Sequence, residues 1–281
     1  MEEFVIILFY KFTDIADPES LRLSQKALGG RLGLKGRVLI AREGINATLE
    51  GTRQNIEIYK KEFHADPRFA DVLIKESAGT GSAFPKLSVK VRKEIVTLGA
   101  GEFDVARETA KELPARELEE WYKKDEDFVV LDLRNDYEIV SGAFEKTINP
   151  KLNNFRDLNE KLPELEHLKD KKVVAVCTGG IRCEKATCLL NRAGFTDLYQ
   201  LKDGIHTYMQ EFPKSHFKGS LFVFDNRMTT PVVDVQTEVI GKCSFCGTTT
   251  EEYWNDDSVR PSKKLLVCSD CALSRQAILR K

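Results

Sequence analysis

The residues in this chain whose types and spacing are best suited to chemistry are its seven cysteines. They form two groups, one around a single stretch (Cys177, Cys183, Cys188) and one near the C-terminus (Cys243, Cys246, Cys268, Cys271). An odd number of cysteines argues against a disulfide framework. Thiolates act instead as nucleophiles or as metal ligands, so each group needs its own chemical explanation.

Cys177 ends an apolar run and begins a glycine-rich turn. The residues that follow it are, in order, Thr178, Gly179, Gly180, Ile181 and Arg182. The glycines let the backbone curl so that N–H groups face inward, and the helix predicted after them adds unpaired N–H groups and a positive end. With the charge of Arg182, this order favours a thiolate and predicts a nucleophile at Cys177. The alternative is an inert buried cysteine at a strand end.

The two other cysteines of this group have different expected roles. Cys183 opens the predicted helix beside Arg182, so its pKa is also expected to be lowered. It could resolve a persulfide or a sulfenate formed on Cys177, although a helix-start residue without chemistry fits the sequence equally well. Cys188 lies in the apolar run TCLLN and is predicted to be part of the core.

The second group consists of two CxxC pairs, CSFC and CSDC, separated by twenty-one residues. Four thiolates complete a tetrahedral zinc site, and Gly247 fits the turn after the first pair. Structural zinc is the favoured prediction, because a tail this short builds little core of its own. Two redox dithiols, or cysteines without metal, are the alternatives. No flavin, haem or iron-ligand motif stands out in the sequence.

The first of the segments that must position these residues is predicted to be an α+β domain, residues 1–99. The order is strand, helix, strand, strand, helix, strand, with helix starts at Asp17-Pro18 and at a Thr52 cap. A tight turn at 43–46 separates the second and third strands. This order predicts a ferredoxin-like, or acylphosphatase-like, sandwich.

Residues 100–218 are predicted to form a connector helix and a parallel α/β sheet. The connector covers 105–127, interrupted at Pro114, and a further helix covers 159–170. Apolar runs at 128–133, 171–177 and 197–204 alternate with helical segments. Residues 219–281 form a small cysteine-rich module that is expected to end in a basic helix over 272–281.

The segment 112–217 resembles a rhodanese domain. The resemblance rests on CTGGIR, on LDLRND before it and on LYQLKDGI after it, while a histidine common in the family is Ala143 here. It implies a persulfide-carrying Cys177 in a loop closed by Arg182, and supporting roles for Asp132 and Arg134. Four residues separate Cys177 from Arg182, against five in phosphatases of related fold. The tighter ring favours sulfur chemistry over phosphate-ester hydrolysis.

The order of motifs along nearly the whole chain resembles one family, the rhodanese-containing tRNA uridine hydroxylases. The motifs are REGINATLEG, CTGGIRCEKA, GSLFVFDNRM and the paired tail cysteines. The resemblance implies an oxidoreductase that uses molecular oxygen to convert wobble uridine 34 of tRNA into 5-hydroxyuridine, with Cys177 essential and the tRNA anticodon loop as partner. It leaves the sulfur or electron donor unidentified.

A basic strand could hold RNA phosphates. Between residues 75 and 94 there are five basic and two acidic residues, and in KLSVKVRKE cations alternate with apolar residues. The predicted contacts are Arg42, Lys86, Lys90, Arg92 and Lys93; a merely solvated strand is the alternative. Further candidates are arginines and aromatic residues that could stack on a base, with core packing as the alternative for the aromatic ones: Arg227, Arg275, Arg280, Phe245, Tyr253 and Trp254.

The bulk properties bound these hypotheses. A net charge of −1 over 281 residues limits any nucleic-acid contact to a local patch. The apolar run 4–10 is too short to span a bilayer and follows acidic residues, so a cytoplasmic protein without a membrane partner is expected. The competing functions are a sulfurtransferase carrying a cysteine persulfide to a small-molecule or protein acceptor, and a non-catalytic RNA-binding module.

Overall fold

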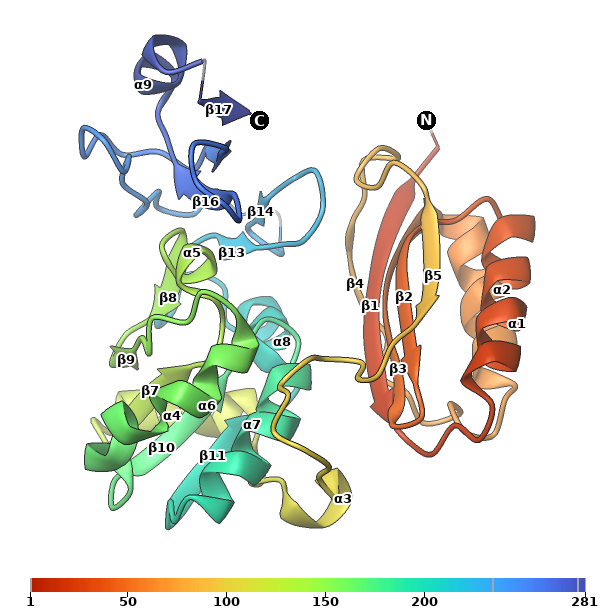
Figure 1. The fold of residues 1–281 in the computed structure, drawn as a ribbon, viewed down its shortest axis with the longest axis horizontal. Helices are drawn as coiled ribbons and strands as arrows, with labels where there is room; N and C mark the ends of the chain where they lie inside the picture. The colour runs from red at the N-terminus through yellow and green to blue at the C-terminus, as the bar shows by residue number, and fades with distance from the viewer. Residues whose placement is uncertain (1, 234, 277, 281) are drawn as a thin grey trace. The chain divides into compact units, whose positions relative to one another are not determined.

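A computed structural model describes residues 2–233, 235–276 and 278–280. The chain forms two compact units that divide between Gly101 and Glu102, and each unit is described by itself (Figure 1). Among the described residues, no helix combines the length and the apolar character needed to cross a bilayer.

The N-terminal unit is a five-stranded sheet of order β4-β1-β3-β2-β5, with both helices on one face (Figure 1). The pairs β1–β3, β2–β3 and β1–β4 are antiparallel, whereas β5 joins β2 in parallel at the edge. This confirms the predicted ferredoxin-like sandwich. The elements are β1 (Phe4–Phe12), α1 (Pro18–Arg31), β2 (Lys35–Ala41), β3 (Gly44–Thr52), α2 (Arg53–His64), β4 (Lys75–Ala78) and β5 (Leu87–Val91).

Local signals account for the helices of this unit. The carboxylate of Asp17 accepts hydrogen bonds from the amides of Glu19 and Ser20, and the Thr52 hydroxyl caps α2. Alternate residues of β1 point into the core, where the rings of Phe9 and Phe63 lie 4.6 Å apart.

The second unit is built on a parallel sheet of order β6-β11-β10-β7-β9. Helices α4 and α8 pack on Val130, Val174 and Val176 of its central strands. The predicted parallel α/β sheet is therefore confirmed. Its elements are α3 (Val105–Glu108), β6 (Lys111–Leu113), α4 (Ala115–Lys123), β7 (Val129–Asp132), α5 (Asp136–Ile139), β8 (Gly142–Phe144), β9 (Thr147–Ile148), α6 (Leu158–Lys161), β10 (Lys172–Val176), α7 (Ile181–Arg192), β11 (Asp197–Leu201), α8 (Gly204–Glu211) and β12 (Phe217–Gly219), with 3₁₀ helices at Phe155–Asp157 and Leu162–Leu168.

The cysteine-rich module belongs to the second unit. Its core joins Phe222, Tyr253 and Leu266 to Tyr137 of α5, and the Tyr253 hydroxyl donates to the Tyr137 carbonyl over 2.6 Å. Its elements are β13 (Leu221–Phe222), β14 (Thr229–Thr230), β15 (Tyr253–Asp256), β16 (Lys263–Leu266), α9 (Ser269–Ser274) and β17 (Leu279–Arg280).

Three helix predictions were wrong in part. The connector contains strand β6, because Leu113 pairs with Leu201 at the sheet edge. The helix expected over 159–170 is α only to Lys161 and continues as a 3₁₀ helix, next to Pro163. The basic C-terminal helix ends at Ser274, and the buried Leu279 belongs to β17. Residues 277 and 281 of that prediction lie outside the described residues. In each case tertiary pairing or proline overrode a helical pattern.

Candidate active site

Cys177 directly follows β10, at the carboxyl end of the parallel sheet, where the sequence predicted it. Gly180 adopts φ 101°, a left-handed conformation that favours glycine. This conformation closes the turn, and the Gly180 amide donates to the Cys177 sulfur over 3.2 Å. The side chain has no exposed surface, so the sulfur is buried but lies among hydrogen-bond donors.

The surroundings of Cys177 stabilise its ionised form. Burial raises the pKa of this thiol, but a hydrogen bond from the Cys183 thiol, the charge of Arg182 and the backbone amides of Cys183 and Arg182 outweigh that effect. The net result lowers the pKa of Cys177 from an ordinary 9.0 to about 6. At neutral pH the sulfur is therefore mainly a thiolate.

Cys183 differs from its prediction. It is buried, and burial together with its hydrogen bond to the Cys177 thiolate raises the pKa of the Cys183 thiol well above the ordinary value. The expected lowering was wrong, because burial of the thiol, together with the negative charge of the neighbouring sulfur, outweighs the nearby arginine. The pair thus consists of one thiolate and one thiol that donates to it. Cys188 is buried as predicted, and its thiol donates to the Glu184 carbonyl over 3.0 Å.

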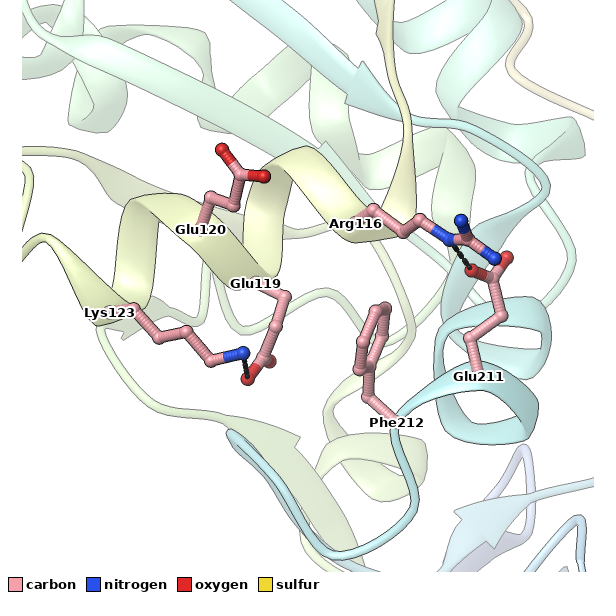
Figure 2. A pocket seen from close by; sticks show the side chains of 6 residues that line it. All are labelled: Arg116, Glu119, Glu120, Lys123, Glu211 and Phe212. Carbon is pink, nitrogen blue, oxygen red and sulfur yellow. Dashed lines mark hydrogen bonds and ion pairs between the residues drawn. The ribbon is translucent and has the colours of Figure 1, made fainter.

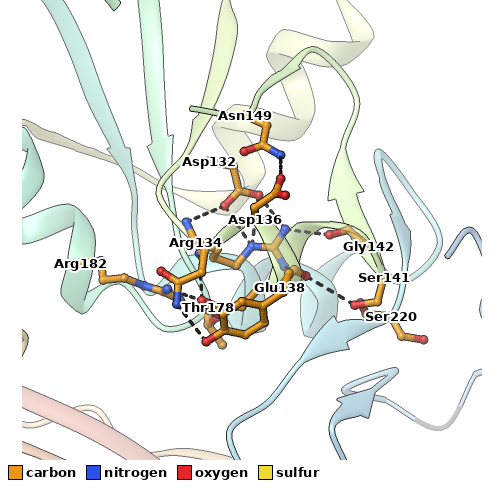
Figure 3. Close-up of polar contacts among 12 residues, drawn as sticks. Asp132, Arg134, Asp136, Glu138, Ser141, Gly142, Asn149, Thr178, Arg182 and Ser220 are labelled. Carbon is orange, nitrogen blue, oxygen red and sulfur yellow. Dashed lines mark hydrogen bonds and ion pairs between the residues drawn. The ribbon is translucent and has the colours of Figure 1, made fainter. Parts of the chain in front are cut away.

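The Arg182 guanidinium forms an ion pair with Glu138, a residue that was not among the predicted site residues. Glu138 of α5 is fully buried and accepts two hydrogen bonds from the Arg182 guanidinium, at 2.6 and 2.9 Å (Figure 3). Arg182 also donates to the Thr178 hydroxyl over 3.1 Å. Although burial alone would lower the pKa of Arg182, the Glu138 carboxylate raises it. In the sequence, Asn135 is followed three residues later by Glu138, which is the pattern of a helix capping box. That pattern is the one local signal that could have drawn attention to Glu138.

Asp132 and Arg134 form a second, fully buried ion pair next to α5. Arg134 donates to both oxygens of Asp132, and its Nη2 also donates to the Gly142 carbonyl over 2.7 Å (Figure 3). These contacts fix the backbone on both sides of Glu138. The pair therefore positions the segment from which Glu138 reaches Arg182.

Helix α8 ties the outer side of the cysteine loop. The amides of Ile205 and His206 each donate over 3.0 Å, to the carbonyls of Cys177 and Thr178 respectively. Gly204 has φ 74°, and a Cβ at this position would lie 2.6 Å from the Gly180 nitrogen. The motif LYQLKDGI gave no indication of this contact between Gly204 and the cysteine loop.

The tail cysteines converge as their spacing predicted. The sulfurs of Cys243, Cys246, Cys268 and Cys271 all lie within 4.8 Å of one another, and those of Cys246 and Cys268 are 3.5 Å apart. Sulfurs bonded tetrahedrally to zinc lie about 3.8 Å apart, so the four residues fit such a metal. Gly247 has φ 74°, and its amide donates to the Cys243 carbonyl over 2.9 Å. This closes the turn around the first pair.

The sequence matches three families in succession along the chain. Residues 4–95 match the UPF0176 acylphosphatase like domain, 114–211 the Rhodanese-like domain, and 218–279 the Rhodanase C-terminal family. The chain is 39% identical over 276 residues to the tRNA uridine(34) hydroxylase of Cytophaga hutchinsonii, covering 98% of this chain and 88% of that protein.

The chain belongs to the tRNA uridine(34) hydroxylase family. It is also 40% identical over 279 residues to the family member of Rhodococcus jostii, covering 96% of this chain and 98% of that one. Among solved structures, a rhodanese-related protein from Thermoplasma volcanium is similar, with 25% identity, a TM-score of 0.29, and coverage of 36% of this chain and 92% of that one. The two relatives of about 40% identity confirm the resemblance identified from the sequence motifs.

For this tRNA uridine(34) hydroxylase family member, the five predicted RNA contacts are exposed residues of the N-terminal unit. Lys90 lies on β5, where its neighbours Leu87 and Val89 pack on the core. Because Ile40 pairs with Val91 in parallel strands, Arg42 and Lys93 follow at the same end of the sheet. Arg92 lies between Val91 and Lys93, and Lys86 immediately precedes β5. Their role toward RNA stays a prediction.

The remaining candidates in the tail divide by burial. Tyr253 is buried in the core, which was the alternative to base stacking given for the aromatic residues. The Arg227 guanidinium pairs with Asp225 over 2.7 Å. Arg275 lies over the exposed Phe245 ring, 4.0 Å from its centroid. Trp254 packs beside the four-cysteine cluster, and Arg280 pairs with Asp257 over 3.2 Å.

A cavity of about 400 Å³ between α4 and α8 is separate from the cysteine loop (Figure 2). Arg116 pairs there with Glu211 over 3.3 Å, and Lys123 pairs with Glu119 over 3.4 Å. The third carboxylate of the lining, Glu120, pairs with Lys124 over 3.4 Å. Each charge of the lining therefore has a partner within the protein, and we assign no ligand to this cavity.

Proposed function

We propose that this protein hydroxylates uridine 34 of tRNA to 5-hydroxyuridine, with dioxygen as the oxygen source and Cys177 as the essential residue. The observation that carries the proposal is the buried Cys177 sulfur, which three backbone amides and the Arg182 charge favour as a thiolate. The relatives are named tRNA uridine(34) hydroxylases, which supports uridine 34 of tRNA as the substrate. Action in the cytoplasm, with tRNA as partner, follows from that substrate.

The residues around the sulfur have separate roles in this proposal. Cys177 supplies the reactive thiolate. Thr178, Gly179, Gly180 and Ile181 form the loop, and the amides of Gly180, Arg182 and Cys183 face the sulfur. Arg182 keeps the sulfur ionised, and Glu138 orients Arg182. Asp132 and Arg134 support the backbone that carries Glu138.

Cys183 is proposed to resolve an oxidised Cys177. A sulfenic acid on Cys177 would condense with the Cys183 thiol, forming the S–S bond and releasing the sulfenic oxygen as water with the thiol proton. The thiol already donates a hydrogen bond to the Cys177 sulfur, so no large movement precedes the reaction.

The four tail cysteines are proposed to bind one structural zinc ion. They supply the Cys₄ ligand set typical of closed structural sites, which leave no open position for a substrate. The protein is proposed to consist of a ferredoxin-like domain (1–99), a connector with a rhodanese-like domain (100–218) and the zinc module (219–281). In this arrangement, zinc stabilises the fold of the third part.

The deciding experiment is nucleoside mass spectrometry of tRNA from cells that lack the gene. We expect 5-hydroxyuridine and modifications built on it to disappear, to return with the wild-type gene, and to stay absent with Cys177→Ser. Unchanged levels in the deletion strain would rule out the proposal. A Cys188→Ser gene, which alters a buried cysteine outside the loop, is the control and is expected to restore the modification.

A second candidate function is sulfur transfer from a Cys177 persulfide. The short loop of four residues between Cys177 and Arg182 favours it, because the space suits one additional sulfur atom. Incubation with thiosulfate and cyanide separates the candidates. Strong thiocyanate formation that Cys177→Ser abolishes would favour the transferase, and a rate equal to that of the variant would exclude it.

A further inference from the structure

A cavity of about 770 Å³ lies where the cysteine-rich module meets the rhodanese-like domain, and no role has been assigned to it. One wall comes from α5 and the segment 152–157, and the other from β15, β16 and Lys242. The volume falls within the roughly 300–1,000 Å³ of sites that enclose small ligands. The cavity is therefore large enough for one nucleotide.

The cavity lining carries more positive than negative charge, because it holds three lysines (Lys242, Lys263 and Lys264) and two aspartates (Asp136 and Asp157). Among the described residues, none of these lysines forms a close ion pair with a carboxylate, although Lys263 lies opposite Asp256 on the neighbouring strand and acts on its charge. Lys242 donates only to the Thr249 hydroxyl over 2.7 Å, and Lys264 donates to the Asn255 side-chain oxygen over 3.2 Å and to the Met228 sulfur over 3.8 Å. Burial and the charge of Arg280 lower the pKa of Lys264, as expected for a cation that lacks an anion.

The two carboxylates in the wall have other partners. Asp136 accepts from the Asn149 amide over 2.8 Å and pairs with Lys151 over 3.1 Å. Asp157 accepts from the backbone amide of Asn154 over 2.9 Å. Three lysines and two aspartates leave the lining with a net charge of +1, and a phosphate is the anion that such a lysine cluster suits.

The remaining lining groups suit a base. The amide side chains of Asn153 and Asn255 offer donors and acceptors, and the Tyr137 ring offers an aromatic surface.

Tyr137 also places the cavity near the reactive cysteine. It lies in α5 next to Glu138, whose carboxylate holds Arg182. One short helix thus contacts both the cavity and the cysteine loop.

We propose that this cavity binds one unstacked nucleotide of the single-stranded RNA loop that carries the target uridine, with the lysines on its phosphate. The inference rests on the proposed function and extends it by naming where a nucleotide next to the target is held. Single-stranded loops are the form of RNA whose bases are free to enter such a site.

The test uses the full chain and a fluorescein-labelled RNA hairpin with uridine at the first anticodon position. Fluorescence anisotropy is measured for wild type, for Lys263→Gln with Lys264→Gln, and for a control with Lys111→Gln and Lys171→Gln, two exposed lysines that do not line the cavity. We expect the cavity variant to bind about tenfold more weakly, with a salt slope smaller by about one to two, and the control to bind like wild type.

Equal affinities of the cavity variant and wild type would overturn the inference, as would an equal loss in the control or no binding by wild type. Photocrosslinking of wild-type protein to hairpins with 4-thiouridine at each loop position avoids any folding defect. Crosslinks to peptides containing 136–140 or 261–266 support the site, and crosslinks confined to 86–93 overturn it. If wild type binds the hairpin but forms no 5-hydroxyuridine, the proposed function fails, while a binding loss in the cavity variant still supports the site.

Discussion

Arg182 and Glu138 form a buried, two-pronged ion pair whose N–O distances are 2.6 and 2.9 Å. Glu138 is separated from Arg182 by 44 positions in the chain, so the pair joins α5 to the cysteine loop. Removing one partner leaves an uncompensated buried charge. We expect Glu138→Ala to lower the free energy of unfolding by about 3 kcal/mol.

Urea denaturation measures this loss, and the double variant with Arg182→Ala is its control. The double variant is expected to be less destabilised than the sum of the single variants, because it leaves neither charge unpaired. Strict additivity would show that the two side chains are not coupled.

The ionisation of Cys177 predicts a pH dependence. Because its pKa is lowered to about 6, the thiolate is present above pH 6 and is lost as the pH falls through that value. Ultraviolet absorbance of the thiolate, corrected with Cys177→Ser, should show a midpoint near pH 6. Arg182→Gln removes a stabilising charge and is expected to move the midpoint upward; a wild-type midpoint near 9 would contradict the geometry described above.

Cys183 is predicted to form a disulfide with Cys177 when the protein is treated with hydrogen peroxide. Peroxide oxidises the Cys177 thiolate to sulfenic acid, and the adjacent thiol then displaces water. Peptide mass spectrometry should find the linked pair in wild type and in Cys188→Ser. In Cys183→Ser, dimedone is expected to trap the sulfenic acid instead. A Cys177–Cys188 linkage, or no linkage at all, would refute the assignment.

Gly204→Ala is predicted to disrupt the cysteine loop. Gly204 has positive φ, and an added Cβ would lie 2.6 Å from the Gly180 nitrogen. Gly194→Ala is a matched control, because Gly194 also has positive φ but a Cβ there meets nothing within 4 Å. Both variants carry backbone strain of about 1 kcal/mol or more, so thermal melts should show a larger loss for Gly204→Ala. Equal losses would mean that the contact with the loop contributes nothing.

Metal removal is predicted to destabilise the cysteine-rich module. Purified protein should contain about one zinc per chain, and Cys246→Ser should lose it together with part of the thermal stability. Elemental analysis and melting curves measure both, with Cys188→Ser as the control. Protein that is free of zinc and unaffected by chelators would favour the redox-dithiol alternative.

The parts of the site that could be predicted are those encoded by neighbouring residues. The strand, the glycine turn and the helix around Cys177 follow one another directly, so their order alone indicates a loop of inward amides. The two CxxC pairs likewise carry their own spacing. The ferredoxin-like order was readable because α1 and α2 have side-chain caps.

The parts that could not be predicted depend on distant contacts. Glu138 meets Arg182 only in the folded chain, and β6 is a strand only because the edge of β11 is available to it. The predicted direction of the Cys183 pKa shift was wrong because the sequence shows its neighbour Arg182 but neither the burial of the thiol nor the sulfur facing it. Local patterns indicate charge and conformation, whereas pairing across the fold decides which charge dominates.

The hydrogen bonds from Ile205 and His206 turn the carbonyls of Cys177 and Thr178 outward. The loop around the sulfur consequently presents hydrogen-bond donors on its inner side and acceptors on its outer side. Such a loop stabilises electron-rich atoms at its centre, whether the bare thiolate or an anion formed on the sulfur.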